Sequence, residues 1–252
     1  MCKARSSGRH LETVMNNQPQ SLSVKVNDKD SVTALLYSAD AKSRLKATIL
    51  LGHGAGANQS SSFMKLFATG LAQRGLDAMT FNFVYTELGK GAPDPKAKLE
   101  SCFRAVIDAA LTNKKLKGSR LFIGGKSMGG RIASQVAADA CEKAEPLAKQ
   151  IDGLVFLGYP LHPPGNPAKL RVEHLPQIKM PMLFLQGTRD SLGTSEEIKP
   201  FIKKLRLPAM LYAIEGGDHS FKAPKKFGKT QDEIYEAAMD EIVKWIKGIL
   251  TT

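Results

Sequence analysis

Short apolar runs and longer amphipathic segments alternate along this chain. The first two runs, 21–26 and 32–37, flank a polar turn at 27–30 and predict a β-hairpin. Six further short apolar runs predict β-strands: 47–51, 78–83, 120–123, 151–157, 182–185 and 210–214. The later runs are almost unbroken apolar stretches, which is typical of parallel strands that are buried on both faces.

Between these runs, apolar residues recur at helical spacing. Five segments have this pattern: 61–74, 96–113, 128–142, 195–205 and 231–249. Eight strands with intervening helices predict an α/β fold, in which a mostly parallel sheet is covered by helices on both faces. No stretch resembles an interdomain linker. We therefore expect a flexible basic tail at 1–20 and a single domain at 21–252.

The composition excludes several classes of protein. Hydrophobic residues make up 42% of the 252 residues, but no window approaches the 18 consecutive apolar residues of a membrane-spanning helix. The N-terminal segment is basic and has no apolar core, so it does not predict a secretory signal. Cys2, Cys102 and Cys141 have no metal-binding spacing and are odd in number. They indicate neither zinc nor a disulfide framework and favour the cytoplasm.

The chain is strongly basic. It contains 36 Lys and Arg residues against 24 Asp and Glu residues, a formal net charge of +12. Such a charge makes nucleic-acid binding worth testing. However, the basic residues are scattered and do not alternate with aromatic residues, which favours solvated helix ends and loops over a polyanion-binding surface. We expect no membrane partner, and the sequence leaves the oligomeric state open.

A glycine-rich turn follows the fifth predicted strand. It reads GGKSMGG at 124–130 and places Ser127 in the pattern GxSxG, just before a predicted helix. A sharp strand-to-helix turn would present the serine hydroxyl above the sheet, over the positive end of the helix. The alternative is an ordinary glycine-rich turn with a hydrogen-bonding serine. The strand before the turn and the helix after it favour a nucleophile.

A serine nucleophile needs a histidine base and a carboxylate that orients the base. His219 lies in a glycine-containing loop after the last predicted strand, and Asp190 follows the seventh. Because ligands bind beyond the carboxyl ends of the strands in such sheets, we expect these side chains at one edge of the sheet. Asp218 is a rival acid, which we expect to cap its own loop instead.

Acyl transfer also needs N–H donors for the negative charge that develops on the substrate oxygen. We expect one from Met128, the residue after the nucleophile. The second should come from the loop after the third strand, GHGAGAN at 52–58, with Ala55 as first candidate and Gly54 as second. We interpret His53 as a residue that braces this loop rather than as a base.

Other residues bear on the substrate. Three are predicted to line the pocket: Gly54, Asn82 and Tyr159. Lys126 and Arg131 flank the nucleophile and would suit an anionic substrate, although we favour a solvated lysine and an arginine on a helix face that pairs with a carboxylate. The proline-rich stretch 159–180 has room for a loop and one short helix. It predicts an open site without a cap domain.

The sequence resembles the α/β-hydrolases, in particular compact, lidless, dienelactone-hydrolase-like members. Five segments between residues 46 and 221 match in the family's order: LGHGAGAN, GGKSMGGRIAS, FLGYPLHPPG, LFLQGTRDSLG and GGDHSF. The order Ser127, Asp190, His219 is also that of the α/β-hydrolases. The resemblance implies that these residues form a triad, that the oxyanion hole lies after the third strand, and that the second of eight strands is antiparallel.

We therefore expect a cytoplasmic serine hydrolase that cleaves a carboxylic ester, or a related acyl bond, of a small soluble substrate. The reaction would pass through an acyl-enzyme intermediate and would need no metal or organic cofactor. A peptidase or thioesterase with the same triad is one alternative. The other is a non-catalytic binding or scaffold protein with a polyanionic partner, supported by the charge alone.

Overall fold

The computed structural model describes residues 18–205 and 209–251, and its centre is an eight-stranded sheet. The strands are β1 (Gln20–Lys25), β2 (Ser31–Tyr37), β3 (Ala47–Gly52), β4 (Asp77–Phe81), β5 (Arg120–Lys126), β6 (Ile151–Leu157), β7 (Met182–Gly187) and β8 (Ala209–Ile214). Their order is β1-β2-β4-β3-β5-β6-β7-β8. The pairs β1–β2 and β2–β4 are antiparallel and the other pairs are parallel, which confirms the predicted antiparallel second strand. Most of the predicted tail, residues 1–17, lies outside the described residues.

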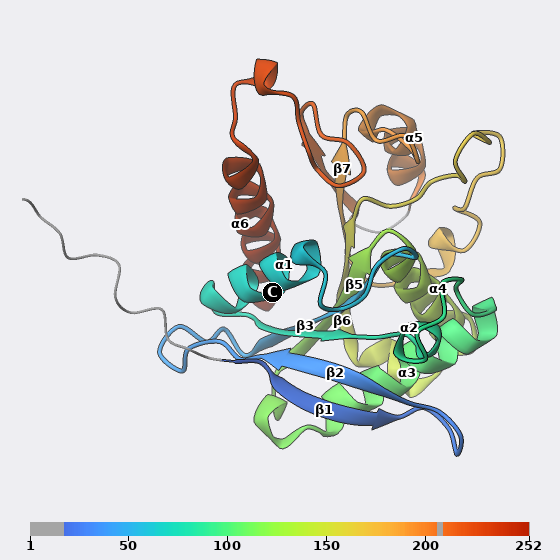
Figure 1. Cartoon of the computed structure of the whole chain (residues 1–252), viewed down its shortest axis with the longest axis vertical. Coiled ribbons are helices and arrows are strands. Elements are labelled where there is room, and N and C mark those ends of the chain that lie inside the picture. The colour runs from blue at the N-terminus through green and yellow to red at the C-terminus, as the bar shows by residue number, and fades with distance from the viewer. Residues whose placement is uncertain (1–17, 206–208, 252) are drawn as a thin grey trace, which may run out of the picture.

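Helices cover both faces of the sheet, as predicted. They are α1 (Ser62–Gln73), α2 (Val84–Glu87), α3 (Lys96–Thr112), α4 (Met128–Glu142), α5 (Ser195–Lys204) and α6 (Gln231–Leu250). Figure 1 shows α1 and α6 on one side of the sheet and α3 and α4 on the other. Phe67 of α1 and Ile242 of α6 belong to one apolar cluster, whereas Phe103 of α3 and Ile132 of α4 belong to the second.

The central strand β3 shows why the apolar runs are unbroken. All six of its residues are buried. Ile49 and Leu51 face the cluster beneath α1 and α6, and Leu50 faces the cluster beneath α3 and α4. Because successive side chains of a strand point to opposite faces, a strand between two helical layers has no solvent-facing position for polar residues.

Strand β5 is longer than its apolar run predicts. The run ends at Ile123, but pairing with β6 continues to Lys126. Glycines make the sequence after Ile123 look like the end of a strand, but the pairing with β6 requires glycine there. A Cβ at Gly124 would lie 1.8 Å from the carbonyl oxygen of Val155. The three extra residues carry the chain to the carboxyl edge of the sheet.

Strand β4 is shorter than predicted, and a helix follows it that the sequence did not indicate. Regular pairing ends at Phe81, and the backbone N–H of Asn82 makes a last bond to β2, to the carbonyl oxygen of Thr33 (3.1 Å). The backbone N–H of Phe83 donates to the ring of His53 (3.2 Å) instead of to a neighbouring strand. The short helix α2 begins at the next residue.

The segment after β6 is short and irregular, in agreement with the prediction that no cap domain is inserted there. Between residues 159 and 180 the structure has turns and one 3₁₀ helix, Leu175–Gln177, which packs against α4. In the described ranges, none of the helices combines the length and the apolar character needed to cross a membrane.

Candidate active site

Ser127 lies at a strained turn between β5 and α4. Its backbone has φ 52° and ψ −114°, a region that residues with a side chain seldom adopt. Serine at the start of a helix usually accepts a hydrogen bond from the first turn, yet this side chain makes no such cap bond. Instead, its Oγ lies 2.8 Å from Nε2 of His219. The turn therefore directs the hydroxyl away from its own helix and toward the histidine.

The glycines on either side of Ser127 allow this turn to pack directly on β3. A Cβ at Gly125 would lie 2.2 Å from the carbonyl oxygen of Gly52, and a Cβ at Gly129 would lie 2.1 Å from the same atom. The atom that would clash belongs to the backbone of a central strand and has little freedom to move. The glycine pattern is thus explained by close packing around the serine.

Asp190 and His219 complete a hydrogen-bonded row with Ser127. Nδ1 of His219 lies 2.8 Å from Oδ2 of Asp190, whose side chain is fully buried. Because an ionised carboxylate only accepts hydrogen bonds, Nδ1 carries the proton and Nε2 presents a lone pair to the serine hydroxyl. The structure thus brings together the three residues predicted from strand ends, in the geometry that general-base activation of a serine requires.

Gln186, at the end of β7, holds the carboxylate in place. Its Nε2 donates to Oδ2 of Asp190 (2.9 Å), and its Oε1 accepts from the backbone N–H of Tyr159 (2.8 Å). The backbone N–H of Leu192 donates to the other oxygen of Asp190 (2.8 Å). The sequence analysis missed Gln186, although a polar residue in the apolar run MLFLQG must find buried partners.

Asp218 has the role expected for a loop cap. Its Oδ1 accepts from the backbone N–H groups of Ser220 (2.7 Å) and Lys222 (2.9 Å). These bonds fix the loop that carries His219. They leave Asp190 as the carboxylate that bonds to the imidazole.

The two predicted sources of N–H donors both lie next to the serine. Met128 is the first residue of α4, where N–H groups have no acceptor within the helix. A Cβ at Gly54 would lie 3.6 Å from Cβ of Ser127, so the loop after β3 lies against the serine. Ala55 is exposed, and its carbonyl accepts from the hydroxyl of Tyr85 (2.9 Å).

His53 braces this loop, as predicted. It is fully buried, with Nδ1 2.8 Å from the carbonyl oxygen of Gly54, while Nε2 accepts from the N–H of Phe83. Burial lowers the pKa of His53, so the ring is neutral at neutral pH. The residue holds the loop on the end of β4 and lies outside the row of Ser127, His219 and Asp190.

The other two predicted pocket residues hold neighbouring loops. Oδ1 of Asn82 accepts from the N–H of Gln59 (3.0 Å), and its Nδ2 donates to Glu87 (2.9 Å). Tyr159 is fully buried, and its hydroxyl donates to the carbonyl oxygen of Arg171 (2.7 Å). Neither side chain is free to turn toward a substrate without breaking these bonds.

Lys126 is not the solvated lysine that we predicted. It is only 9% exposed, and its amine donates to the carbonyl oxygen of His219. The amine also lies 5.7 Å and 5.8 Å from the ring centres of Phe63 and Phe221. Burial lowers the pKa of Lys126 to about 8, although the charge of Asp190 opposes this effect. The prediction fails because β5 continues to residue 126 and carries the side chain under the histidine loop.

The predicted partner of Arg131 is also missing. Within the described residues, no carboxylate forms an ion pair with this arginine. Its Nε is buried and has no hydrogen-bond partner in this part of the chain. Among these residues, the expectation that Arg131 pairs with a carboxylate is therefore wrong.

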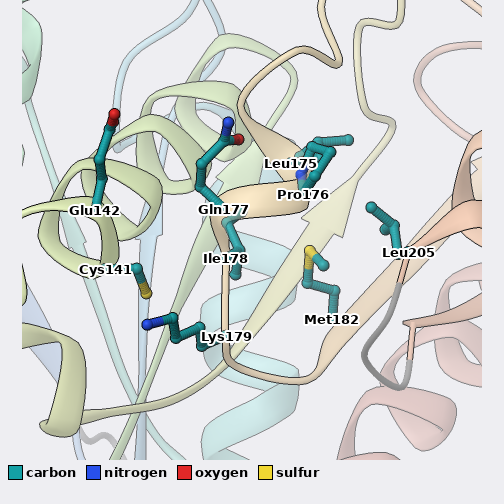
Figure 2. Close-up of a pocket in the computed structure, with 9 residues that line it drawn as sticks. All are labelled: Cys141, Glu142, Leu175, Pro176, Gln177, Ile178, Lys179, Met182 and Leu205. Carbon is teal, nitrogen blue, oxygen red and sulfur yellow. The ribbon is translucent and has the colours of Figure 1, made fainter.

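A pocket of about 550 Å³ lies elsewhere, between the end of α4 and the segment before β7. Figure 2 shows the residues that line it, among them Cys141, Ile178 and Met182. None of its lining residues belongs to the row of Ser127 and its partners. The candidate site therefore rests on the hydrogen-bond geometry around the serine.

Comparisons with known proteins agree with this architecture. The sequence profile of a family described as "Alpha/beta hydrolase domain" matches residues 45–247. A dienelactone hydrolase from Anabaena variabilis is similar in structure (20% identity, TM-score 0.69, 92% of this chain and 98% of that chain). A lidless serine hydrolase from Xanthomonas campestris is also similar (16% identity, TM-score 0.63, 90% of this chain and 94% of that chain). So is ferulic-acid-bound Est1E from Butyrivibrio proteoclasticus (14% identity, TM-score 0.70, 92% of this chain and 100% of that chain). At these identities the likeness is one of fold.

Proposed function

The chain belongs to the alpha/beta hydrolase domain family, and from this premise we propose that it is a serine hydrolase that cleaves an ester or a related acyl bond. The observation that carries the proposal is the row of two 2.8 Å contacts that joins Ser127, His219 and Asp190. A serine hydroxyl is a weak nucleophile at neutral pH unless a base removes its proton during attack. This row supplies such a base in the required tautomer.

The reaction follows from these positions. Nε2 of His219 takes the proton of Ser127 as Oγ attacks the acyl carbon, and the charge of Asp190 stabilises the imidazolium that forms. The N–H groups of Met128 and Ala55 donate to the oxyanion of the tetrahedral intermediate. His219 then gives its proton to the leaving group, and a water molecule releases the acyl group by the same steps in reverse.

The surroundings of the site favour small, soluble esters. No cap domain is inserted at 159–180, so no large apolar surface is available there for a long acyl chain. Similar folds carry the names dienelactone hydrolase and esterase, which favours oxygen esters as substrates. Thioesters and amides use the same catalytic groups and are included in the substrate test.

The first experiment is labelling by a fluorophosphonate, read as intact mass, which requires an activated serine but no knowledge of the substrate. We expect one adduct on the parent protein and none on Ser127→Ala. Ser134→Ala is the matched control, because Oγ of Ser134 also lies beside a histidine (His174, 2.7 Å) but donates its proton to the carbonyl oxygen of Arg131. This variant should be labelled like the parent.

Labelling is followed by hydrolysis of p-nitrophenyl butyrate, an acyl thioester and an acyl anilide. Turnover of the butyrate that disappears in Ser127→Ala is the expected result. A parent protein that is neither labelled nor active on any of the three compounds would overturn the proposal and favour a binding protein on this fold.

A further inference from the structure

Lys126 is a buried charge that the proposed reaction leaves unused. Among the lysines and arginines of residues 18–205 and 209–251, it is the only one that is buried. Moving an ammonium out of water is costly unless specific partners receive it, and burial lowers the pKa of Lys126 to about 8. The partners of its amine therefore indicate what the side chain does.

The amine lies beside both the backbone and the ring of the proposed base. It donates to the carbonyl oxygen of His219. In the described ranges no backbone N–H donates to that oxygen, so Lys126 supplies its hydrogen bond. A Cβ built on Gly158, just after β6, would lie 3.0 Å from the amine of Lys126 and 3.4 Å from Nδ1 of His219. The amine is therefore close to the imidazole as well as to the carbonyl.

Two aromatic rings also attract the ammonium. Its nitrogen lies 5.7 Å and 5.8 Å from the ring centres of Phe63 and Phe221, within the range of a cation–π interaction. The two rings also contact each other, with their centres 5.7 Å apart. Phe63 is in the first turn of α1, and Phe221 follows His219 by two residues. Helix α1 and the loop of the base thus meet at this amine.

The loop that carries His219 needs support because its backbone is strained. Phe221 is fully buried and has φ 65°, in the left-handed region that bulky residues avoid. Such residues persist only where the surrounding contacts hold them in place. Asp218 supports the loop from within, through its bonds to the N–H groups of Ser220 and Lys222. Lys126 supports it from the sheet.

The stem of Lys126 lies against the loop after β3. A Cβ at Gly54 would lie 3.7 Å from Cγ of Lys126 and 3.6 Å from Cβ of Ser127. One side chain therefore contacts the loop of the expected oxyanion donors and the loop of the base. It extends from β5, which is paired with β3 and β6, and directly precedes the nucleophile. A group on such a strand holds its position better than a group on a loop.

We propose that Lys126 is a positioning residue: by its bond to the carbonyl oxygen of His219, it keeps the imidazole within reach of Ser127 and Asp190. The inference rests on the proposed hydrolase function. A charged donor forms a stronger hydrogen bond than a neutral one, which explains why a lysine stands where an apolar residue would avoid the cost of burial. The charges of Asp190 and Asp218 attract the ammonium and offset part of that cost.

Lys126→Met tests the proposal, because methionine keeps most of the shape and removes both the charge and the donor. We expect kcat for p-nitrophenyl butyrate to fall about 10- to 100-fold, since a shift of a catalytic group by about 1 Å has an effect of this size. KM should stay within about twofold of the parent, because the contacts to the bound ester are unchanged.

A loss of folded protein must be separated from a loss of positioning. We therefore express kcat per serine that a fluorophosphonate labels after complete reaction, so that misfolded molecules are not counted. A role in folding alone would lower the number of labelled serines and leave kcat per labelled serine unchanged.

Two further variants are matched to Lys126→Met. Lys126→Arg keeps a charge and N–H donors at the same position, and it should recover part of the lost kcat. Lys117→Met removes one positive charge from an exposed position before β5, and its kcat should equal that of the parent.

A measurement that needs no turnover reports on His219 itself. The proton that Nδ1 donates to Asp190 gives a downfield NMR signal as long as this hydrogen bond protects it from exchange with water. The signal should be present in the parent and in Lys117→Met. In Lys126→Met it should be broadened or absent, because the histidine loop is no longer held.

The outcomes separate the two proposals. In a labelled and active parent, a kcat of Lys126→Met within about twofold of the parent, with the same downfield signal, would overturn the role of Lys126 and keep the hydrolase. A parent without labelling or turnover would refute the hydrolase. The downfield signal would then decide alone: its loss in Lys126→Met would support the positioning of His219, and an unchanged signal would overturn it.

Discussion

Replacing Lys126 by methionine should change how the stability of the protein depends on pH. Burial lowers the pKa of this lysine to about 8 in the folded state, whereas the unfolded chain has the usual value of 10.5. Below pH 8 both states hold the proton, and the folded state bears the full cost of a buried charge. Between about pH 8 and 10.5 the unfolded state binds more protons than the folded state, so the free energy of unfolding rises with pH.

The size of this rise follows from the two pKa values. Each pH unit between them contributes about 1.4 kcal/mol, so the parent should gain about 2–3 kcal/mol between pH 7 and pH 10 from Lys126 alone. Methionine has a similar shape and does not titrate. The stability of Lys126→Met relative to the parent should therefore fall by that amount between pH 7 and pH 10.

Urea unfolding of both proteins at each pH measures the difference, because groups that titrate equally in both cancel. The exposed Lys117 is the matched control, and Lys117→Met should keep the pH dependence of the parent. If Lys126→Met differs from the parent by the same amount at pH 7 and pH 10, the inference of a strained, buried ammonium under His219 is refuted.

Three further changes test other parts of the structure. Asp190→Asn should keep the fold but reduce kcat by about 10⁴ on a hydrolysed ester, because an amide stabilises the wrong tautomer of His219; a loss below tenfold would contradict the role of the carboxylate. Gly129→Ala places a Cβ 2.1 Å from the carbonyl oxygen of Gly52 and should lower the free energy of unfolding, measured by urea denaturation, by at least about 2 kcal/mol. An unchanged urea midpoint would show that β3 can move. Burial raises the pKa of Cys102 to about 12, so a thiol reagent at pH 8 should label it only after unfolding, and rapid labelling of native protein would contradict its burial.

Much of the fold could be predicted because single elements carry unambiguous signals. The run at 151–157 is apolar except for Asp152 and forms β6 with the predicted bounds, and the segment 128–142 forms α4 with the predicted bounds. Errors occur where tertiary contacts override local preference. Glycines at 124 and 125 suggest the end of a strand, yet close packing on β6 and β3 needs them inside β5. The backbone N–H of Phe83 donates to a ring nitrogen of His53 instead of to a neighbouring strand, so β4 ends earlier than predicted.

The candidate site also has features that could be predicted from the sequence and others that depend on tertiary contacts. Ser127, Asp190 and His219 could be placed together because the carboxyl ends of neighbouring strands meet at one edge of the sheet. The surroundings of Lys126 could not be predicted, because they depend on Phe63 and Phe221 from distant parts of the sequence. The missing partner of Arg131 has the same origin, since a helical segment does not show which carboxylates of the fold its arginine would face.

The short segment between β6 and β7 has a consequence for the fate of the acyl group. Many enzymes that transfer an acyl group to a second substrate must exclude bulk water until that substrate binds to the acyl-enzyme. In this chain, residues 159–180 form turns and one 3₁₀ helix, and the side chain of His219 keeps 24% of its surface exposed. Water thus has direct access to His219, the base that would activate it. An acyl group on Ser127 would therefore react with water before a second substrate, which is present at a much lower concentration, could bind. The shape of the loop therefore favours hydrolysis over transfer.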